Sequence, residues 1–391
     1  MAGNITKLKD GSYRLRYRDC STNVQAKTDR AAEKLLAKFI TEVDAGDFTQ
    51  PSKVTFEEFT KKWLEKFVEL ELAPKTVFRY KQILNARILP RFGKMRLEKI
   101  KPLDLVEFYK SLKTSHKYLG ISRKDGTLQE ATCEGLSDKS IRHHHAIICA
   151  IFEKAIKWGV FKGENPGHHV DAPKVARKQE KHYDLDEVRT MIKALEKEEL
   201  HHQVAVMIAL NCGMRLGEVC GLEWQDIWFD KGIIEVRQTS QYLPGQGVFT
   251  KAPKTESSKR RISANKALLG LLRVYQKDQQ EKGFLCADNN RLFVTWDGKP
   301  AFPNAISKWF TYFIRRNNLP PLNFHGLRHT SATFLISQGM DVQTVAGCLG
   351  HSTSATTHNI YSHFLESKDK QAADLMESAF GALPKDNSKK A

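Results

Sequence analysis

Apolar and polar residues follow two different periods in the first part of the chain. Residues 12–18, SYRLRYR, alternate apolar and arginine side chains with a period of two, which predicts a β-strand with one face toward a core. Residues 30–46, RAAEKLLAKFITEVDAG, repeat their apolar residues every three or four positions, which predicts a helix that stops at Gly46. We therefore expect residues 1–52 to form a small three-stranded sheet with one helix.

Residues 53–176 show helical spacing almost throughout. Thr55 followed by Glu58 has the pattern of a capping box, in which each residue satisfies the other's backbone N–H, and it marks the start of a helix. A glycine-containing stretch over 114–137 predicts an inserted hairpin or loop. Further helices are expected over 74–92, 101–112 and 137–159, and linkers over 49–53 and 164–182.

Residues 177–391 combine helices with strand-like stretches. A helix is predicted over 184–198, and PGQG at 244–247 would turn the chain between two strands. Strands are expected within 232–243, 247–255 and 259–266. The fold class is mostly α with small β elements (α+β), in three domains: 1–52, 53–176 and 177–391.

A short amphipathic helix is predicted over 367–384, with Pro384 as its stop. Its apolar stripe must be buried somewhere, either on its own domain or on a neighbouring protomer. The stripe consists of Ala372, Leu375, Met376, Ala379, Phe380 and Leu383.

Charge narrows the range of partners. The 391 residues carry a formal net charge of +17, which is typical of proteins that meet phosphate-rich polymers or anionic membrane surfaces. Residues 53–176 hold 24 basic and 15 acidic residues, more than half of the excess. There is no run of eighteen apolar residues and no signal-peptide core, so we expect a cytoplasmic protein without a membrane partner.

Two groups of basic residues are candidates for DNA contact. Arg14, Arg16 and Arg18 would form the polar face of the first predicted strand, and Lys75 and Arg79 lie on a predicted helix. The alternative for the strand is an edge position with solvated charges. The three histidines at 143–145 would point around a helix, and we expect a polar surface facing DNA there rather than a metal site.

The seven cysteines are scattered and form no CxxC pair, so the sequence favours reduced thiols over disulfides or a zinc site. His325 and His329 have zinc-like spacing, but Gly326 replaces the glutamate of a zinc protease motif and no third ligand is indicated. No metal is expected.

Two polar segments near the end of the chain carry chemistry of another kind. NFHGLRHT at 323–330 places His325 and Arg328 in one turn, and HSTSATTHNIYSH at 351–363 contains Tyr361. Phosphodiester cleavage without metal needs a nucleophile, cations for the non-bridging oxygens and an acid for the leaving oxygen. Arginine suits the second task because its planar fork binds phosphate bidentately. Arg215 is another candidate, and Tyr361 can act as the nucleophile if positive charge stabilises its phenolate.

Taken singly, each of these residues has an ordinary explanation. Arg215 could be a surface ion-pair partner, Lys254 a solvated hairpin lysine and Tyr361 an amphipathic tyrosine. Taken together, the motifs resemble those of the tyrosine recombinases, the integrases of phages and conjugative transposons. The matching segments are GMRLGE (Arg215, Glu218), PKTESSKR (Lys254), HGLRH (His325, Arg328), LGHS (His351) and TTHNIYSH (Tyr361).

The resemblance implies a role for each residue. Tyr361 would attack the phosphate, giving a 3′-phosphotyrosine and a free 5′-hydroxyl, and Lys254 would protonate the leaving oxygen. Arg215 and Arg328 would hold the non-bridging oxygens, with Glu218 orienting Arg215. His325 and His351 would hydrogen-bond the phosphate and help to move the tyrosine proton.

The resemblance also implies the partners. Residues 1–52 would bind arm sites and 53–176 core sites on double-stranded DNA, without a cofactor. The protein would act as a homo-tetramer on attachment sites and be a monomer or weak oligomer when free, with an excisionase and a host DNA-bending protein as possible partners. The alternatives are a chromosome-dimer resolvase or inversion recombinase, and a catalytically inactive DNA-binding relative.

Overall fold

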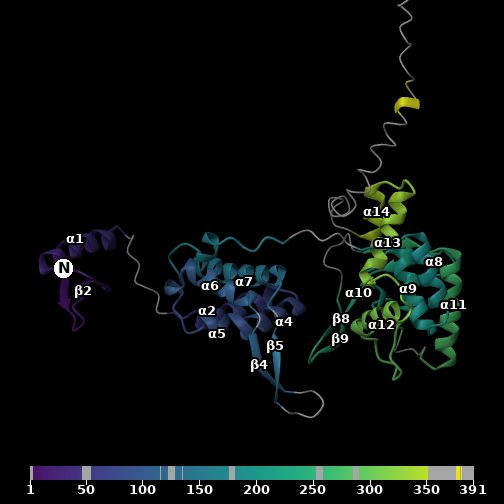
Figure 1. Cartoon of the computed structure of the whole chain (residues 1–391), viewed down its shortest axis with the longest axis horizontal. Helices are drawn as coiled ribbons and strands as arrows, with labels where there is room; N and C mark the ends of the chain where they lie inside the picture. Colours follow the sequence, from purple (N-terminus) through teal and green to yellow (C-terminus); the bar gives the residue numbers. More distant parts are fainter. Residues whose placement is uncertain are drawn as a thin grey trace, which may run out of the picture. The chain divides into compact units, whose positions relative to one another are not determined.

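The computed structural model describes residues 3–45, 54–114, 116–121, 128–133, 135–175, 181–251, 259–284, 290–350, 376–378 and 380. The chain divides into two compact units, residues 1–177 and 178–391. Both consist mainly of helices with small antiparallel sheets, so the predicted fold class is confirmed (Figure 1). The expected domain boundaries at 52 and 176 lie outside the described residues and stay predictions.

The first 45 residues form the predicted sheet and helix. Strands β1 (Asn4–Lys7), β2 (Tyr13–Tyr17) and β3 (Cys20–Val24) are antiparallel in that order, and α1 (Asp29–Asp44) follows. Leu15 and Tyr17 of β2 are buried with Phe39 of α1 in a small core of their own. The period of two along β2 therefore gives the buried face that it predicts.

The arginine face of β2 is shorter than expected. Arg14 and Arg16 lie on the strand, but Arg18 has φ of 51° in the turn that leads to β3. Its guanidinium pairs with Asp44 at 3.0 Å and lies over the Tyr17 ring. The expected place of Arg18 on the strand was wrong, because the chain turns one residue earlier than the alternation suggests. Its contact with DNA stays a prediction.

Residues 54–170 contain the predicted helices around an aromatic and aliphatic core. The capping box is confirmed: Thr55 Oγ1 accepts from Glu58 N at 3.2 Å, and Thr55 N donates to Glu58 Oε2 at 2.8 Å. Two helices continue through a π-helical turn. The elements are α2 (Phe56–Trp63), η1 (Leu64–Val68), α3 (Glu69–Glu71), α4 (Pro74–Ile83), η2 (Leu84–Ile88), α5 (Leu89–Phe92), η3 (Leu97–Lys99), α6 (Pro102–Lys113) and α7 (Asp138–Lys157).

The insertion between α6 and α7 is a hairpin rather than a loop. Strands β4 (His116–Ile121) and β5 (Leu128–Cys133) pair in antiparallel register, with His116 opposite Cys133. Figure 1 shows the two strands projecting from the helices. The segment thus takes the first of the two structures that the sequence allowed.

Two expectations for this region hold only in part: the three histidines point around the helix but do not form one polar surface, and the linker begins later than residue 164. Only His143 of the three consecutive histidines is exposed: His144 is buried and donates to the Ser140 carbonyl, and the His145 ring contacts the Tyr109 hydroxyl at 3.1 Å. The expected linker at 164–182 begins with a packed 3-10 turn, η4 (Pro166–His169), where the Asn165 amide donates to the Cys149 carbonyl at 3.0 Å. Helix packing overrides the polarity of both stretches.

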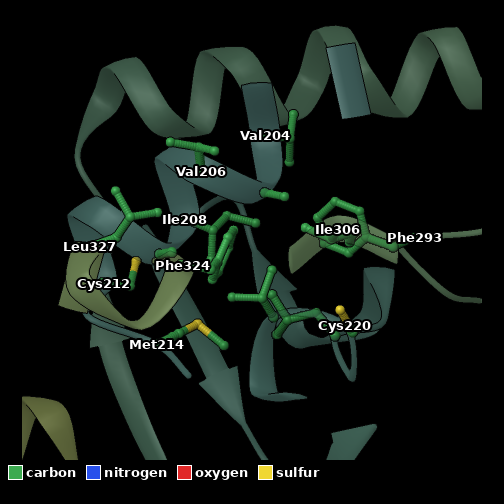
Figure 2. Close-up of a cluster of buried hydrophobic side chains, with 14 of the residues drawn as sticks. Val204, Val206, Ile208, Cys212, Met214, Cys220, Phe293, Ile306, Phe324 and Leu327 are labelled. Carbon is green, nitrogen blue, oxygen red and sulfur yellow. The ribbon is translucent and has the colours of Figure 1, made fainter. Parts of the chain in front are cut away.

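The second unit is built around one helix whose middle is apolar. Helix α9 (Leu200–Cys212) carries LHHQVAVMIALNC and packs against α11 and α13. Figure 2 shows Val204, Val206 and Ile208 of this helix among the buried side chains, whereas Asn211 is exposed. The helices are α8 (Leu185–Leu195), α9 (Leu200–Cys212), α10 (Leu216–Val219), η5 (Trp224–Asp226), α11 (Lys266–Glu281), α12 (Pro303–Arg316), α13 (Phe324–Ser337) and α14 (Val342–Leu349).

The strands of this unit form two sheets, where the sequence suggested one set of three strands. Strands β6 (Ile227–Trp228), β7 (Ile233–Val236) and β10 (Arg260–Ser263) form one sheet, and β8 (Thr239–Leu243) pairs with β9 (Gly247–Lys251). The break falls at Arg237, which binds Glu223 and Asp226. The predicted turn between β8 and β9 is confirmed.

Helical residues also occur near the end of the chain, at 376–378 and 380. Met376 and Phe380 are 60% and 76% exposed. The other apolar residues of this predicted helix lie outside the described residues. Across the described parts of the chain, no helix is long and apolar enough to cross a membrane.

Candidate active site

The site begins where α9 ends. Gly213 follows Cys212 in the left-handed conformation, with φ of 58°, and reverses the chain before α10. A Cβ atom at this position would lie 2.4 Å from Leu349 Cδ2, so a side chain does not fit. The Gly213 carbonyl accepts a hydrogen bond from Arg328 Nη1 at 2.7 Å. The turn therefore joins α9, α13 and the end of α14.

Arg215 is positioned by the cap of the next helix. It is the N-cap residue of the short α10, and Glu218, three residues on, accepts from its backbone N at 3.0 Å and its Nη1 at 2.8 Å. Arg215 Nη2 also donates to the Gly350 carbonyl at 3.3 Å. The side chain remains 38% exposed. The R-x-x-E spacing thus gives a guanidinium fixed on one side and open on the other.

Glu218 is buried between two arginines. Its carboxylate contacts Arg215 Nη1 and Arg260 Nη2, both at 2.8 Å. Burial alone would raise the pKa of Glu218, but the hydrogen bond and charge of Arg260, together with the bonds from Arg215, outweigh burial and lower it. Glu218 is therefore ionised at neutral pH and can hold Arg215 in one orientation.

Helix α13 carries His325 and Arg328 one turn apart. Asn323 caps this helix by accepting from Gly326 N at 2.9 Å. A Cβ at Gly326 would lie 2.3 Å from Leu322 Cδ1, which accounts for the glycine in HGLRH by packing. His325 is exposed, whereas Arg328 is 1% exposed. His325 is therefore accessible to solvent, whereas Arg328 is buried within the unit.

His329 lies beside His325, with ring centroids 4.8 Å apart in an edge-on arrangement. Burial, followed by the charges of His325 and Arg328, lowers the pKa of His329 to about 4. The neutral ring packs behind His325. Within the described residues, the group of side chains close enough to hold a metal is elsewhere, at Glu199, His201 and His202.

The structure brings part of the predicted site together. Arg215, Glu218 and Arg328 converge on the turn at Gly213, with His325 on the neighbouring helix. Lys254, His351 and Tyr361 lie outside the described residues, so their places in the site stay predictions. Lys75 and Arg79 are exposed on α4, and Arg14 and Arg16 lie on β2. Their contacts with DNA also stay predictions.

Sequence reasoning missed Arg260, which contacts Glu218 and the end of α14. Arg260 Nε donates to the Cys348 carbonyl at 2.9 Å, and Arg260 Nη2 donates to Glu218 Oε2 at 2.8 Å. Neither contact has a local sequence signal, because Glu218 and Cys348 lie 42 and 88 positions away. The one sequence feature that pointed to Arg260 was its position as the last residue of the PKTESSKR segment.

Known proteins are similar to this chain in both sequence and fold. Residues 181–368 match the model of the phage integrase family, and residues 55–113 match that of the N-terminal SAM-like domain of phage integrases. The ICEBs1 integrase of Bacillus subtilis (strain 168) is 28% identical over 392 residues, covering 96% of this chain and 99% of that one.

Solved structures of integrases have a fold similar to that of this chain. The Tn1549 transposon integrase in complex with transposon right end DNA has a TM-score of 0.67 at 22% identity, covering 84% of this chain and 100% of that one. A lambda integrase tetramer bound to a Holliday junction has a TM-score of 0.55 at 17% identity, covering 90% of this chain and 94% of that one. The chain belongs to the phage integrase family, the tyrosine-type site-specific recombinases.

Proposed function

We propose that this recombinase is the integrase of a mobile element, which it inserts and excises by cutting and rejoining DNA through a 3′-phosphotyrosine. The observation that carries the proposal is the Arg215–Glu218 pair, an exposed guanidinium held by a buried carboxylate next to Arg328. The match to the ICEBs1 integrase along 96% of the chain supports a mobile element over a chromosomal resolvase.

In the proposed reaction, the Tyr361 oxygen attacks the scissile phosphorus while the 5′-oxygen leaves. Arg215 and Arg328 stabilise the charge that grows on the non-bridging oxygens, because guanidinium groups bind phosphate oxygens in a planar fork. His325 and His351 hydrogen-bond the phosphate and help to move the tyrosine proton. Lys254 protonates the 5′-oxygen.

Rejoining is the same step in reverse. The 5′-hydroxyl of a partner strand attacks the phosphotyrosine, and Tyr361 leaves. The phosphotyrosine replaces the phosphoester bond that is lost when the phosphodiester is cut. The strand exchange therefore needs neither ATP nor a divalent metal. Glu218 takes no part in proton transfer in this scheme. Its role is to hold Arg215.

We further propose that the chain acts on double-stranded attachment sites as a tetramer. The support comes from similar solved structures, in which the Tn1549 integrase is bound to transposon right end DNA and lambda integrase forms a tetramer on a Holliday junction. The module with Arg14 and Arg16 on β2 would bind arm sites, and α4 with Lys75 and Arg79 would contact core sites. An excisionase and a host DNA-bending protein would set direction.

The test is covalent capture of DNA. Genomic DNA of the strain that carries the gene is incubated with purified protein, and the DNA that stays bound in denaturant is sequenced to define a site. A nicked duplex of that site then traps the cleavage product. Tyr361→Phe should abolish the adduct while DNA affinity stays within about twofold, because removal of one hydroxyl disturbs few phosphate contacts.

The matched control is Tyr312→Phe, which alters an exposed tyrosine on α12 and should leave the adduct unchanged. An adduct formed by Tyr361→Phe would show that another residue is the nucleophile. If the wild-type protein binds the duplex without any adduct, the chain is a DNA-binding relative and the proposed function is wrong.

A further inference from the structure

Arg260 connects three segments of the second unit through one side chain. It is the first residue of β10, opposite Val236 of β7, and its side chain is 7% exposed. Nη2 donates to Glu218 Oε2 at 2.8 Å and Nε donates to the Cys348 carbonyl at 2.9 Å. The guanidinium thus bridges α10 and the last turn of α14.

The contact with α14 depends on a glycine. Gly350 caps that helix with φ of 66°, and a Cβ there would lie 2.8 Å from Arg260 Nη1. The absence of a side chain lets the guanidinium approach the turn. A residue with a side chain would be strained by the backbone conformation and would also push Arg260 away.

These contacts close a ring around Arg215. Arg215 binds Glu218, Glu218 binds Arg260, Arg260 binds the end of α14, and the Gly350 carbonyl accepts from Arg215 Nη2. Each link restrains the next, because Arg260 must keep one planar orientation to reach two acceptors on different elements. Lysine supplies the same charge but no planar fork.

We propose that Arg260 is a positioning residue of the recombination reaction: it fixes Glu218 and the turn at Gly350, and through both it holds the Arg215 guanidinium where it meets the scissile phosphate. The inference rests on the proposed function. Arg260 does not itself touch the phosphate in this scheme, so its loss should weaken charge stabilisation without removing the nucleophile.

The neighbouring residue provides a matched control. Arg261 lies on the same strand, but its side chain is 60% exposed, pairs with Glu235 at 3.0 Å and stacks over the Trp228 ring. Arg261→Lys and Arg260→Lys therefore make the same chemical change on one strand. Only the second change breaks the ring around Arg215.

The first measurement is the rate of covalent adduct formation on the nicked duplex at saturating protein, together with DNA affinity and thermal stability. Arg260→Lys should keep the charge beside Glu218, and hence folding and affinity, while adduct formation slows by about 10²-fold, as expected when a catalytic group is misplaced by about 1 Å. Gly350→Ala should slow it similarly, and Arg261→Lys should cleave like the wild type.

The second measurement separates positioning from a general structural role. A methylphosphonate at the scissile position has no negative charge, so its cleavage depends little on a well-placed guanidinium. For Arg260→Lys the ratio of phosphate to methylphosphonate cleavage rates should fall at least about tenfold from the wild-type ratio, because only the charged substrate loses its stabilising contact.

The outcomes are distinct. If both rates fall by the same factor in Arg260→Lys, the variant has merely lost active molecules and the positioning role is wrong. If Arg260→Lys cleaves like Arg261→Lys, the ring around Arg215 has no influence on catalysis and the inference also fails. If the wild-type protein itself forms no adduct, it is the proposed function that fails.

Discussion

At the scale of single residues, each of three arginines of the candidate site donates a hydrogen bond to a backbone carbonyl. Arg328 donates to Gly213, Arg215 to Gly350 and Arg260 to Cys348. A carbonyl orients a guanidinium without cancelling its charge, and the one carboxylate of Glu218 is shared by Arg215 and Arg260. Positive charge is thus retained where a phosphate would bind.

His329 makes the second unit sensitive to acid. Burial lowers its pKa from the ordinary value of 6.5 to about 4 in the fold, so between these values the unfolded chain binds more protons than the folded chain. Unfolding free energy should therefore fall as pH drops from 6.5 to 4, by up to about 3 kcal/mol from this residue. His329→Gln should lose less stability across this window.

The measurement is urea denaturation of both proteins at pH values from 7.5 to 4. A second variant, His202→Gln, replaces a ring that stacks on Trp309 and has a pKa lowered to about 3 by burial and by the charges of His201 and Arg316. This variant should also lose less unfolding free energy than the wild type as the pH falls. Parallel curves for wild type and His329→Gln would contradict the assignment.

At the scale of elements, the capping box of α2 offers a test of local stability. Thr55→Ala removes the side-chain acceptor for Glu58 N and should lower the unfolding free energy by about 1 kcal/mol. Thr55→Ser keeps the hydroxyl and should remain near the wild type. Chemical denaturation followed through hydrogen exchange of the α2 amides reports on this helix, and an unchanged midpoint for Thr55→Ala would show that the cap contributes nothing.

Elements with a local cause could be predicted from the sequence. Alternation along 12–18 gave β2, the capping box gave the start of α2, and PGQG gave the turn between β8 and β9. The family resemblance also implied that Glu218 orients Arg215, and the structure shows that their spacing is that of a helix cap.

Features caused by tertiary contacts could not be predicted. His144 is polar in sequence but faces a helix core, and the break between β7 and β8 depends on Arg237 reaching Glu223 and Asp226. Arg260 acquires its place only when β10 meets the end of α14, 88 positions away. Such residues have no neighbouring pattern that reveals them.

At the scale of the whole molecule, the end of the chain is expected to act between protomers. Met376 and Phe380 lie in helical residues yet stay 60% and 76% exposed, which leaves apolar surface uncovered in a single chain. If a neighbour covers it, ending the chain at Ser367 should preserve binding of one protomer to one site. Assembly of paired sites and recombination should collapse.

Gel-shift and recombination assays on the trapped site distinguish these steps. The full-length double variant Met376→Glu/Phe380→Glu should reproduce the truncation, while Glu377→Gln, an exposed change between them, should not. Recombination by the shortened chain at the wild-type rate would mean that the end of the chain serves only its own catalytic unit.

Gly213 and Gly350 bear on how this sequence can evolve. Any side chain at Gly213 would overlap Leu349, and any at Gly350 would overlap Arg260. Neither glycine has a side chain that could bind DNA, yet both should tolerate fewer replacements than the exposed arginines that we propose to contact DNA. We therefore expect relatives with new target sites to differ on their DNA-contacting surface while these two positions remain glycine.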